Sequence, residues 1–184
     1  MTFRDYLCEQ HACSAAIEWS GDRSAYDTWH DCPRVDWMLW LADHLDVRRE
    51  LLVLCATGCA RSVLHLVPED DNRSRCAIET TEAWCYGRAR LVEVRAASAV
   101  AASAVAASVV AAYAASAYAS AASAAYADAA YAASAASDAA YAAAAAGLCT
   151  REHALARYAH GVREVIPWQH VADRLRAMGV EVEG

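Results

Sequence analysis

Lysine is absent from this sequence, and phenylalanine occurs only once in its 184 residues. All sixteen basic residues are therefore arginine, and with 23 acidic residues the formal net charge is −7. The arginines form no cluster, whereas nucleic acids and anionic membranes are usually bound by a concentrated basic surface. The composition predicts that the protein binds neither nucleic acid nor a membrane surface.

Long runs of strongly apolar residues are also missing. The least charged stretch lies between Val92 and Gly147 and contains no leucine, isoleucine or phenylalanine. Alanine contributes almost nothing to membrane insertion, and serine and aspartate oppose it, so we expect no membrane-spanning helix. The first ten residues include Arg4, Asp5 and Glu9 and lack the apolar centre of a secretion signal, which predicts a cytoplasmic protein.

The eight cysteines do not form a recognisable metal-binding or disulfide pattern. In a reducing cytoplasm most cysteines pack as small hydrophobic residues. Cys55 and Cys59 are one helical turn apart and could bind zinc with His65 or another cysteine, and the other cluster is Cys8, His11 and Cys13. Structural zinc sites usually combine two close pairs of ligands, however, so we expect no metal and no other cofactor.

Motifs of common enzyme active sites are absent as well. There is no glycine-rich phosphate loop, no G-x-S-x-G serine motif and no H-E-x-x-H zinc motif. Seven histidines and eight cysteines would allow a cysteine–histidine nucleophile pair, but the spacing favours no particular pair. We predict that the protein is not an enzyme, and a cysteine-dependent enzyme is the less favoured alternative.

Helix start and stop signals occur throughout the chain, and no stretch alternates as a strand would. Thr2 and Asp5 match a capping box, and Ser24 and Thr150 are further N-cap candidates. Gly147 is suited to end a helix. These signals predict an all-α fold.

One strongly apolar helix is expected to begin near residue 36. Asp36 is a good N-cap residue ahead of an apolar run. The spacing of Trp37, Trp40, Leu41 and His44 places them on one face of this helix. We interpret that face as core packing.

The dominant feature of the sequence is an alanine-rich segment. The 52 residues from Ala96 to Gly147 comprise 32 alanines, eight serines, five tyrosines, four valines, two aspartates and the closing glycine. Alanine is the best helix former, and no proline or internal glycine interrupts the segment. Disorder is usually accompanied by proline, glycine and high charge, so we predict helix here.

The length of the chain fits a single domain. We expect short helices bearing tryptophan and cysteine over residues 1–90, the alanine-rich helical segment over 91–147 and C-terminal helices over 148–184. One continuous helix over the segment would be roughly 78 Å long, which exceeds a compact domain of this size. We therefore predict a bent or broken segment that is covered by the flanking helices or by a partner.

The polar residues of the segment are unevenly distributed. Seven of the eight serines fall in one broad sector of a helical wheel, opposite a sector that is mostly alanine. The larger residues follow another spacing, because Val100, Tyr113 and Tyr126 are thirteen residues apart. Thirteen residues is not a whole number of turns, so one straight helix cannot keep them on one face.

Tyrosines with nearby serine and aspartate are candidates for contacts with a ligand or partner. Tyrosine offers a flat apolar face and a hydroxyl, which suits recognition. The candidates are Tyr113, Ser116, Tyr118, Tyr126, Tyr131 and Asp138. Alternatively, the tyrosines fill gaps between alanine-rich helices. Ice binding is less favoured, because that function usually uses regular rows of threonine and this segment has none.

Several short motifs in the first part of the chain resemble a known group of proteins. They are Ala12-Cys13-Ser14, Ala16-Ile17-Glu18-Trp19, Trp29 with Cys32, and Asp36-Trp37-Met38-Leu39-Trp40-Leu41-Ala42, followed by the alanine-rich tract. Together they resemble alanine-rich proteins of phage and bacterial genomes that are related to immunity proteins of the Imm5-like kind. The resemblance covers about residues 12–146.

The resemblance implies an all-α, non-catalytic protein of the bacterial host cytoplasm, encoded by a phage or prophage. Such a protein would act in counter-defence by binding and neutralising a toxin, a host-defence protein or a defence-signalling small molecule. The identity of that protein or small-molecule partner stays open. The alternative is a structural helical protein that forms a homo-oligomer in a virion or scaffold.

Overall fold

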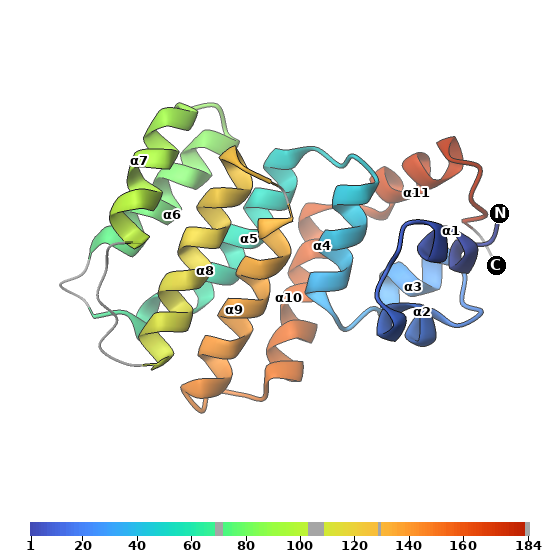
Figure 1. Cartoon of the computed structure of the whole chain (residues 1–184), viewed down its shortest axis with the longest axis horizontal. Coiled ribbons are helices and arrows are strands. Elements are labelled where there is room, and N and C mark those ends of the chain that lie inside the picture. The colour runs from blue at the N-terminus through green and yellow to red at the C-terminus, as the bar shows by residue number, and fades with distance from the viewer. Residues whose placement is uncertain (69–71, 103–108, 129, 183–184) are drawn as a thin grey trace.

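The computed structural model describes residues 1–68, 72–102, 109–128 and 130–182 of the chain. Every regular element in these ranges is a helix, which confirms the predicted all-α fold (Figure 1). The helices are α1 (Phe3–Glu9), α2 (Ser14–Ser20), α3 (Ala25–Asp31), α4 (Val35–His44), α5 (Arg49–Ser62), the 3-10 helix η1 (Leu64–Leu66), α6 (Asn72–Cys85), α7 (Leu91–Ala102), α8 (Val109–Tyr126), α9 (Tyr131–Ala145), α10 (Arg151–Val165) and α11 (Trp168–Ala177).

Local capping signals fix the starts of three helices. The backbone N–H of Asp5 donates to the Thr2 hydroxyl at 3.1 Å, and the Asp5 carboxylate accepts from Thr2 in return, which completes the capping box of α1. The hydroxyls of Ser24 and Thr150 accept from the third residue of α3 and α10 in the same way. These three predicted caps are confirmed.

The expected N-cap of α4 is wrong. The helix begins at Val35, and Arg34 occupies the N-cap position with extended backbone. Asp36 lies within the first turn, where its carboxylate accepts two hydrogen bonds from the Arg34 guanidinium. The negative charge still stabilises the positive end of the helix dipole, but the side chain does not cap the backbone.

The alanine-rich segment is broken, as predicted, and contributes α7, α8 and α9. α8 and α9 are joined by a short connection and pack side by side as antiparallel neighbours (Figure 1). At this connection the Asp128 carboxylate accepts from the backbone N–H of Ala130 at 2.9 Å. Such an aspartate turn redirects the chain without glycine or proline.

Alanine faces meet inside the molecule. On α8 the buried positions include Ala114, Ala117 and Ala121, which follow helical spacing. α9 buries Ala132, Ala135, Ala136, Ala139 and Ala143 in the same manner. Both helices pack on α5, and side chains this small let the helix backbones approach closely.

The polar sector predicted from the wheel holds only within single helices. Ser116 and Ser134 are exposed, but Ser98 on α7 is buried with 3% of its surface exposed. A wheel drawn through the whole segment assumes one continuous helix. α7, α8 and α9 are separate helices with different axes, so residues that superpose on the wheel do not share a face (Figure 1).

The helices form a bundle with two ends (Figure 1). α5 to α9 make one end, with α6 and α7 beside α8. α4 and α10 pack together and against α9 in the middle, and α1, α2, α3 and α11 form the other end. Among the described residues, no helix has both the length and the apolar character that crossing a membrane requires.

Candidate functional site: an aromatic pocket beside α4

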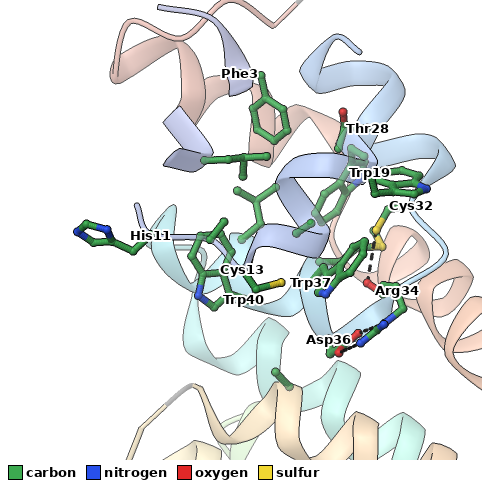
Figure 2. A pocket seen from close by; sticks show the side chains of 17 residues that line it. Phe3, His11, Cys13, Trp19, Thr28, Cys32, Arg34, Asp36, Trp37 and Trp40 are labelled. Carbon is green, nitrogen blue, oxygen red and sulfur yellow. Dashed lines mark hydrogen bonds and ion pairs between the residues drawn. The ribbon is translucent and has the colours of Figure 1, made fainter. Parts of the chain in front are cut away.

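A pocket of about 500 Å³ lies where α1, α2 and α3 meet α4 (Figure 2). Its lining is mainly apolar and aromatic. Four of the six tryptophans contribute to it, namely Trp19, Trp29, Trp37 and Trp40. α9 reaches the pocket through Ala133. The volume falls in the range of small-molecule sites, which is about 300–1,000 Å³.

The sequence of α4 serves both the core and this pocket. Val35, Leu39 and Ala42 are fully buried and face the interior of the bundle. Trp37 and Trp40 lie on neighbouring helix positions, are only half-buried and line the pocket. Both rings also pack against the hydrophobic core, as predicted, so this face of α4 serves the core and the pocket together.

The Trp40 ring is held from within its own helix. The imidazole of His44 packs on the indole, with ring centroids 4.0 Å apart. The His44 Nδ1 atom is also 2.9 Å from the Trp40 carbonyl oxygen. His44 therefore positions a tryptophan of the pocket wall.

Two arginines and two tryptophans form a ladder, of which Trp19, Trp37 and Arg34 line the pocket. The Arg23 guanidinium carbon lies over the Trp19 ring at 4.8 Å, and that of Arg34 lies over the Trp37 ring at 4.7 Å. The two indoles are in contact, with centroids 6.1 Å apart and planes inclined by 53°. This Arg–Trp ladder joins α2 to α4, and each cation–π contact contributes roughly 0.5–1 kcal/mol at a partly exposed site.

Arg34 closes the ladder through a salt bridge. Its Nε and terminal nitrogen donate to the Asp36 carboxylate at 2.9 and 2.5 Å. The hydrogen bonds that Arg34 donates to Asp36 raise the pKa of Arg34 above its usual value. The guanidinium is therefore fixed in its plane against Trp37, since bidentate pairs are geometrically specific.

α10 also stabilises the wall of the pocket. Arg163 donates from Nε to the Trp29 carbonyl oxygen at 2.9 Å and from its terminal nitrogen to the Cys32 carbonyl oxygen. These carbonyls lie at the C-terminal end of α3, where arginine is a favourable capping partner. Arg163 thereby fixes the segment that carries Trp29 and Cys32.

Two cysteines line the pocket and differ in environment. Cys32 is buried, and burial raises its pKa to about 11, so its sulfur is a neutral thiol at physiological pH. Cys13 is exposed, and Figure 2 places its sulfur between Trp40 and Trp37. Cys8 is also exposed but does not belong to the lining.

The two cysteines considered for zinc binding with His65 lie elsewhere. Cys55 and Cys59 are buried on α5, and burial raises the pKa of Cys59 to about 12. Within the described residues, no group of three or more potential ligands could hold a metal ion. A thiol that stays protonated is a poor nucleophile, and burial keeps both residues from solvent.

Three of the predicted contact residues come together on the surface of α8 and α9. The Ser116 hydroxyl donates to the Asp138 carboxylate at 2.7 Å, and partial burial raises the pKa of Asp138. One turn away, the rings of Tyr113 and Tyr141 stack with centroids 5.3 Å apart. The Arg151 guanidinium carbon lies over Tyr141 at 4.4 Å. The residues of this polar and aromatic surface are distant in sequence from the pocket residues other than Ala133, which alone among them belongs to α8 or α9.

The other predicted contact residues do not join them. Tyr118 is buried with 1% exposure, so a ligand at the surface cannot reach it. Tyr131 is exposed at the start of α9. Tyr126 ends α8, and its side chain lies outside the described residues.

The pocket residues were missed as a site, although a signal was present. The motifs that carry the family resemblance supply much of the lining, including Cys13, Ala16, Trp19, Trp29 and Trp37. Scattered over 30 residues of sequence, they converge only when α1 to α4 pack together. Comparisons with protein-family models, with curated proteins and with solved structures found no match to this chain.

Proposed function

We propose that this protein is a non-enzymatic binding protein that holds a small molecule in the aromatic pocket between α1 and α4. The observation that carries the proposal is the pocket of about 500 Å³ with four tryptophans in its wall. A single amino-acid side chain from a protein partner would leave much of this space unfilled. A small molecule would fill it, and preorganised aromatic walls lower the entropic cost of binding.

Two functional groups of the lining, those of Asp36 and Cys32, support binding rather than catalysis. Asp36 is occupied by Arg34, and Cys32 is a buried neutral thiol. A general acid, base or nucleophile needs a free functional group beside the reacting atoms. The Asp36 carboxylate instead pairs with Arg34, and the Cys32 thiol donates to the Arg34 carbonyl oxygen, so both groups stabilise the pocket wall.

In this proposal the protein acts in the cytoplasm of a bacterial host and is encoded by a phage or prophage. The resemblance to Imm5-like immunity proteins suggests neutralisation as the biological role. Of the three targets considered, a defence-signalling small molecule agrees best with the dimensions of the pocket. Sequestration would then lower the free concentration of that signal.

A matched pair of variants tests the proposal. Purified protein is incubated with a small-molecule extract of bacterial cells and desalted, and retained compounds are identified by mass spectrometry after denaturation. Ala16 lines the pocket, whereas its neighbour Ala15 is exposed on α2. We expect a compound that is retained by wild type and Ala15→Trp and lost in Ala16→Trp. Retention by Ala16→Trp, or no retained compound, would contradict the proposal.

A second candidate function is the binding of a toxin or host-defence protein by the surface of α8 and α9. The observation that favours it is the cluster of Ser116, Asp138, Tyr113, Tyr141 and Arg151 described above. Tyrosine and arginine are enriched among residues that dominate protein interfaces. Arg151→Ala and Tyr141→Ala would weaken such binding and leave small-molecule retention unchanged, which separates the two functions.

A further inference from the structure

The pocket of the proposed function restricts the charge of its occupant. Arg34 and Asp36 are the fixed charges in the lining, and they neutralise each other through two hydrogen bonds. His11 also contributes to the lining, but its imidazole extends away from the other side chains (Figure 2). A charged ligand group would lose its hydration against indole and aliphatic surfaces without gaining a partner, which is costly. An uncharged occupant avoids this cost.

The Arg–Trp ladder argues specifically against a cationic ligand. Aromatic cages bind quaternary ammonium groups through the negative faces of the rings. Here one guanidinium already lies over Trp19 and another over Trp37, at 4.8 and 4.7 Å. These guanidinium groups occupy ring faces that an ammonium cage would use. Trp19 and Trp37 therefore do not form an ammonium cage.

The remaining walls combine aromatic rings with aliphatic side chains, among them Leu7, Met38 and Leu41. Phe3 and Trp29 are 3% and 1% exposed, so neighbouring side chains hold both rings in place. Trp40 is stacked on His44. Rigid rings favour a flat, rigid partner, because edge-to-face and offset contacts between aromatic rings stabilise a complex beyond the burial of area. A flexible aliphatic molecule would lose more entropy on binding and gain none of these contacts.

We infer that the pocket binds an uncharged, planar aromatic molecule of roughly two or three fused rings, a size that suits its volume. The inference rests on the proposed function, in that it names the ligand class of the same site. The bound molecule lies among Phe3, Trp29 and Trp40, with the Arg–Trp ladder along one side.

Four probes of similar size test this ligand class. They are 2-naphthol, 2-naphthoate, 2-naphthyltrimethylammonium and decahydro-2-naphthol, which vary charge and planarity separately. The readout is the rate at which N-ethylmaleimide alkylates Cys13 in the full chain, followed by mass spectrometry. Cys8 provides an internal reference, because it is exposed and lies outside the pocket lining.

We expect saturating 2-naphthol to slow the alkylation of Cys13 at least about fivefold and to leave Cys8 unchanged. Half-maximal protection by the other three probes should need at least about tenfold higher concentrations, which corresponds to about 1.4 kcal/mol. In Ala16→Trp, 2-naphthol should no longer change the rate at Cys13, whereas Ala15→Trp should behave as wild type.

Three results would overturn the inference: equal or better protection by the ammonium probe, equal protection by decahydro-2-naphthol, or no protection by 2-naphthol. Each can be separated from failure of the proposed function. If a bacterial compound is retained by wild type and lost in Ala16→Trp while 2-naphthol gives no protection, the pocket binds another ligand class. If neither compound nor probe depends on Ala16, both proposals fail.

Discussion

The hydroxyl of Thr28 is buried beside the pocket and has no hydrogen-bond partner among the residues that the structure describes. A buried polar group without a partner has lost its hydration with no compensation, which typically costs about 1–3 kcal/mol. Thr57 on α5 is also buried, but its hydroxyl donates to the Val53 carbonyl oxygen at 3.0 Å. The two threonines therefore provide a comparison between an unsatisfied and a satisfied hydroxyl.

We predict that Thr28→Val leaves stability unchanged or raises it by up to about 1 kcal/mol, because a methyl group replaces an unsatisfied hydroxyl. Thr57→Val should lower stability by about 0.5–1.5 kcal/mol, because it removes a hydrogen bond. Urea unfolding monitored by circular dichroism measures both. A clear loss of stability in Thr28→Val would show that its hydroxyl has a partner in solution.

The roles of some single residues could be predicted from the sequence, and those of others could not. The caps Thr2, Ser24 and Thr150 were predictable, since capping depends on residues three positions away. Asp36 was assigned wrongly, because the competing guanidinium of Arg34 is not part of the capping pattern. Trp37 could not be identified as a pocket residue, because helical spacing describes a core face and a pocket wall equally well.

At the scale of the element, α8 and α9 depend on alanine for their close packing. The two helices are separated at a turn in which the Asp128 carboxylate accepts a backbone hydrogen bond. Neither proline nor glycine marks this turn, so the sequence does not predict its position. The breaking of the segment as such was predictable, because a single rod of that length would leave a poorly solvated surface. The buried faces could not be predicted, because they depend on the rotation of each separate helix about its own axis.

We predict that Ala117→Leu lowers the stability of the protein by about 1–3 kcal/mol, because Ala117 is fully buried and a larger side chain would force α8 away from its neighbours. For a protein of this size, each 1 kcal/mol lowers the melting temperature by about 2–4 °C. Ala112 on the same helix is exposed, so Ala112→Leu is the control and should have little effect. Equal effects in calorimetry would argue against close packing at Ala117.

The Ser116–Asp138 hydrogen bond between α8 and α9 leads to a pH-dependent prediction. Burial raises the pKa of Asp138 in the folded protein, so the folded state binds more protons than the unfolded state between the two pKa values. Stability consequently falls as pH rises through that interval, and the cost is fully present at neutral pH. Asp138→Asn removes the charge, while the amide oxygen can still accept from Ser116.

Asp138→Asn should therefore increase the urea midpoint at pH 7. The gain should shrink as the pH is lowered and the Asp138 carboxylate of the wild-type protein becomes protonated. Asp5 is the matched opposite, because hydrogen bonds from Thr2 lower its pKa. Asp5→Asn should reduce the midpoint at pH 7, with a smaller loss in acid. A loss of stability at pH 7 in Asp138→Asn would indicate that the charged form is favoured.

At the scale of the whole molecule, the arrangement bears on the alternative of an oligomeric scaffold. The alanine faces of α8 and α9 are covered by α5 and by each other. The alanine surface, which we expected to be covered by flanking helices or by a partner, is thus largely buried within one chain. Self-association through these faces would require the bundle to open.

We predict that the protein is a monomer of 19.8 kDa at micromolar concentration. Size-exclusion chromatography with light scattering measures the mass directly, and dilution over a hundredfold range checks for weak association. A defined dimer or larger assembly would instead support the structural alternative. In that case Arg151→Ala on the surface of α8 and α9 would show whether the assembly uses that surface.

The concentration of indoles around one pocket has an optical consequence. Trp19, Trp29, Trp37 and Trp40 line it, whereas Trp84 and Trp168 lie elsewhere. Most of the intrinsic fluorescence of the protein should therefore originate at one site, where an aromatic compound in contact with the rings can quench it by energy transfer. The molecule carries a built-in reporter of pocket occupancy, and libraries of unlabelled compounds can be titrated against the wild-type chain without attaching a dye.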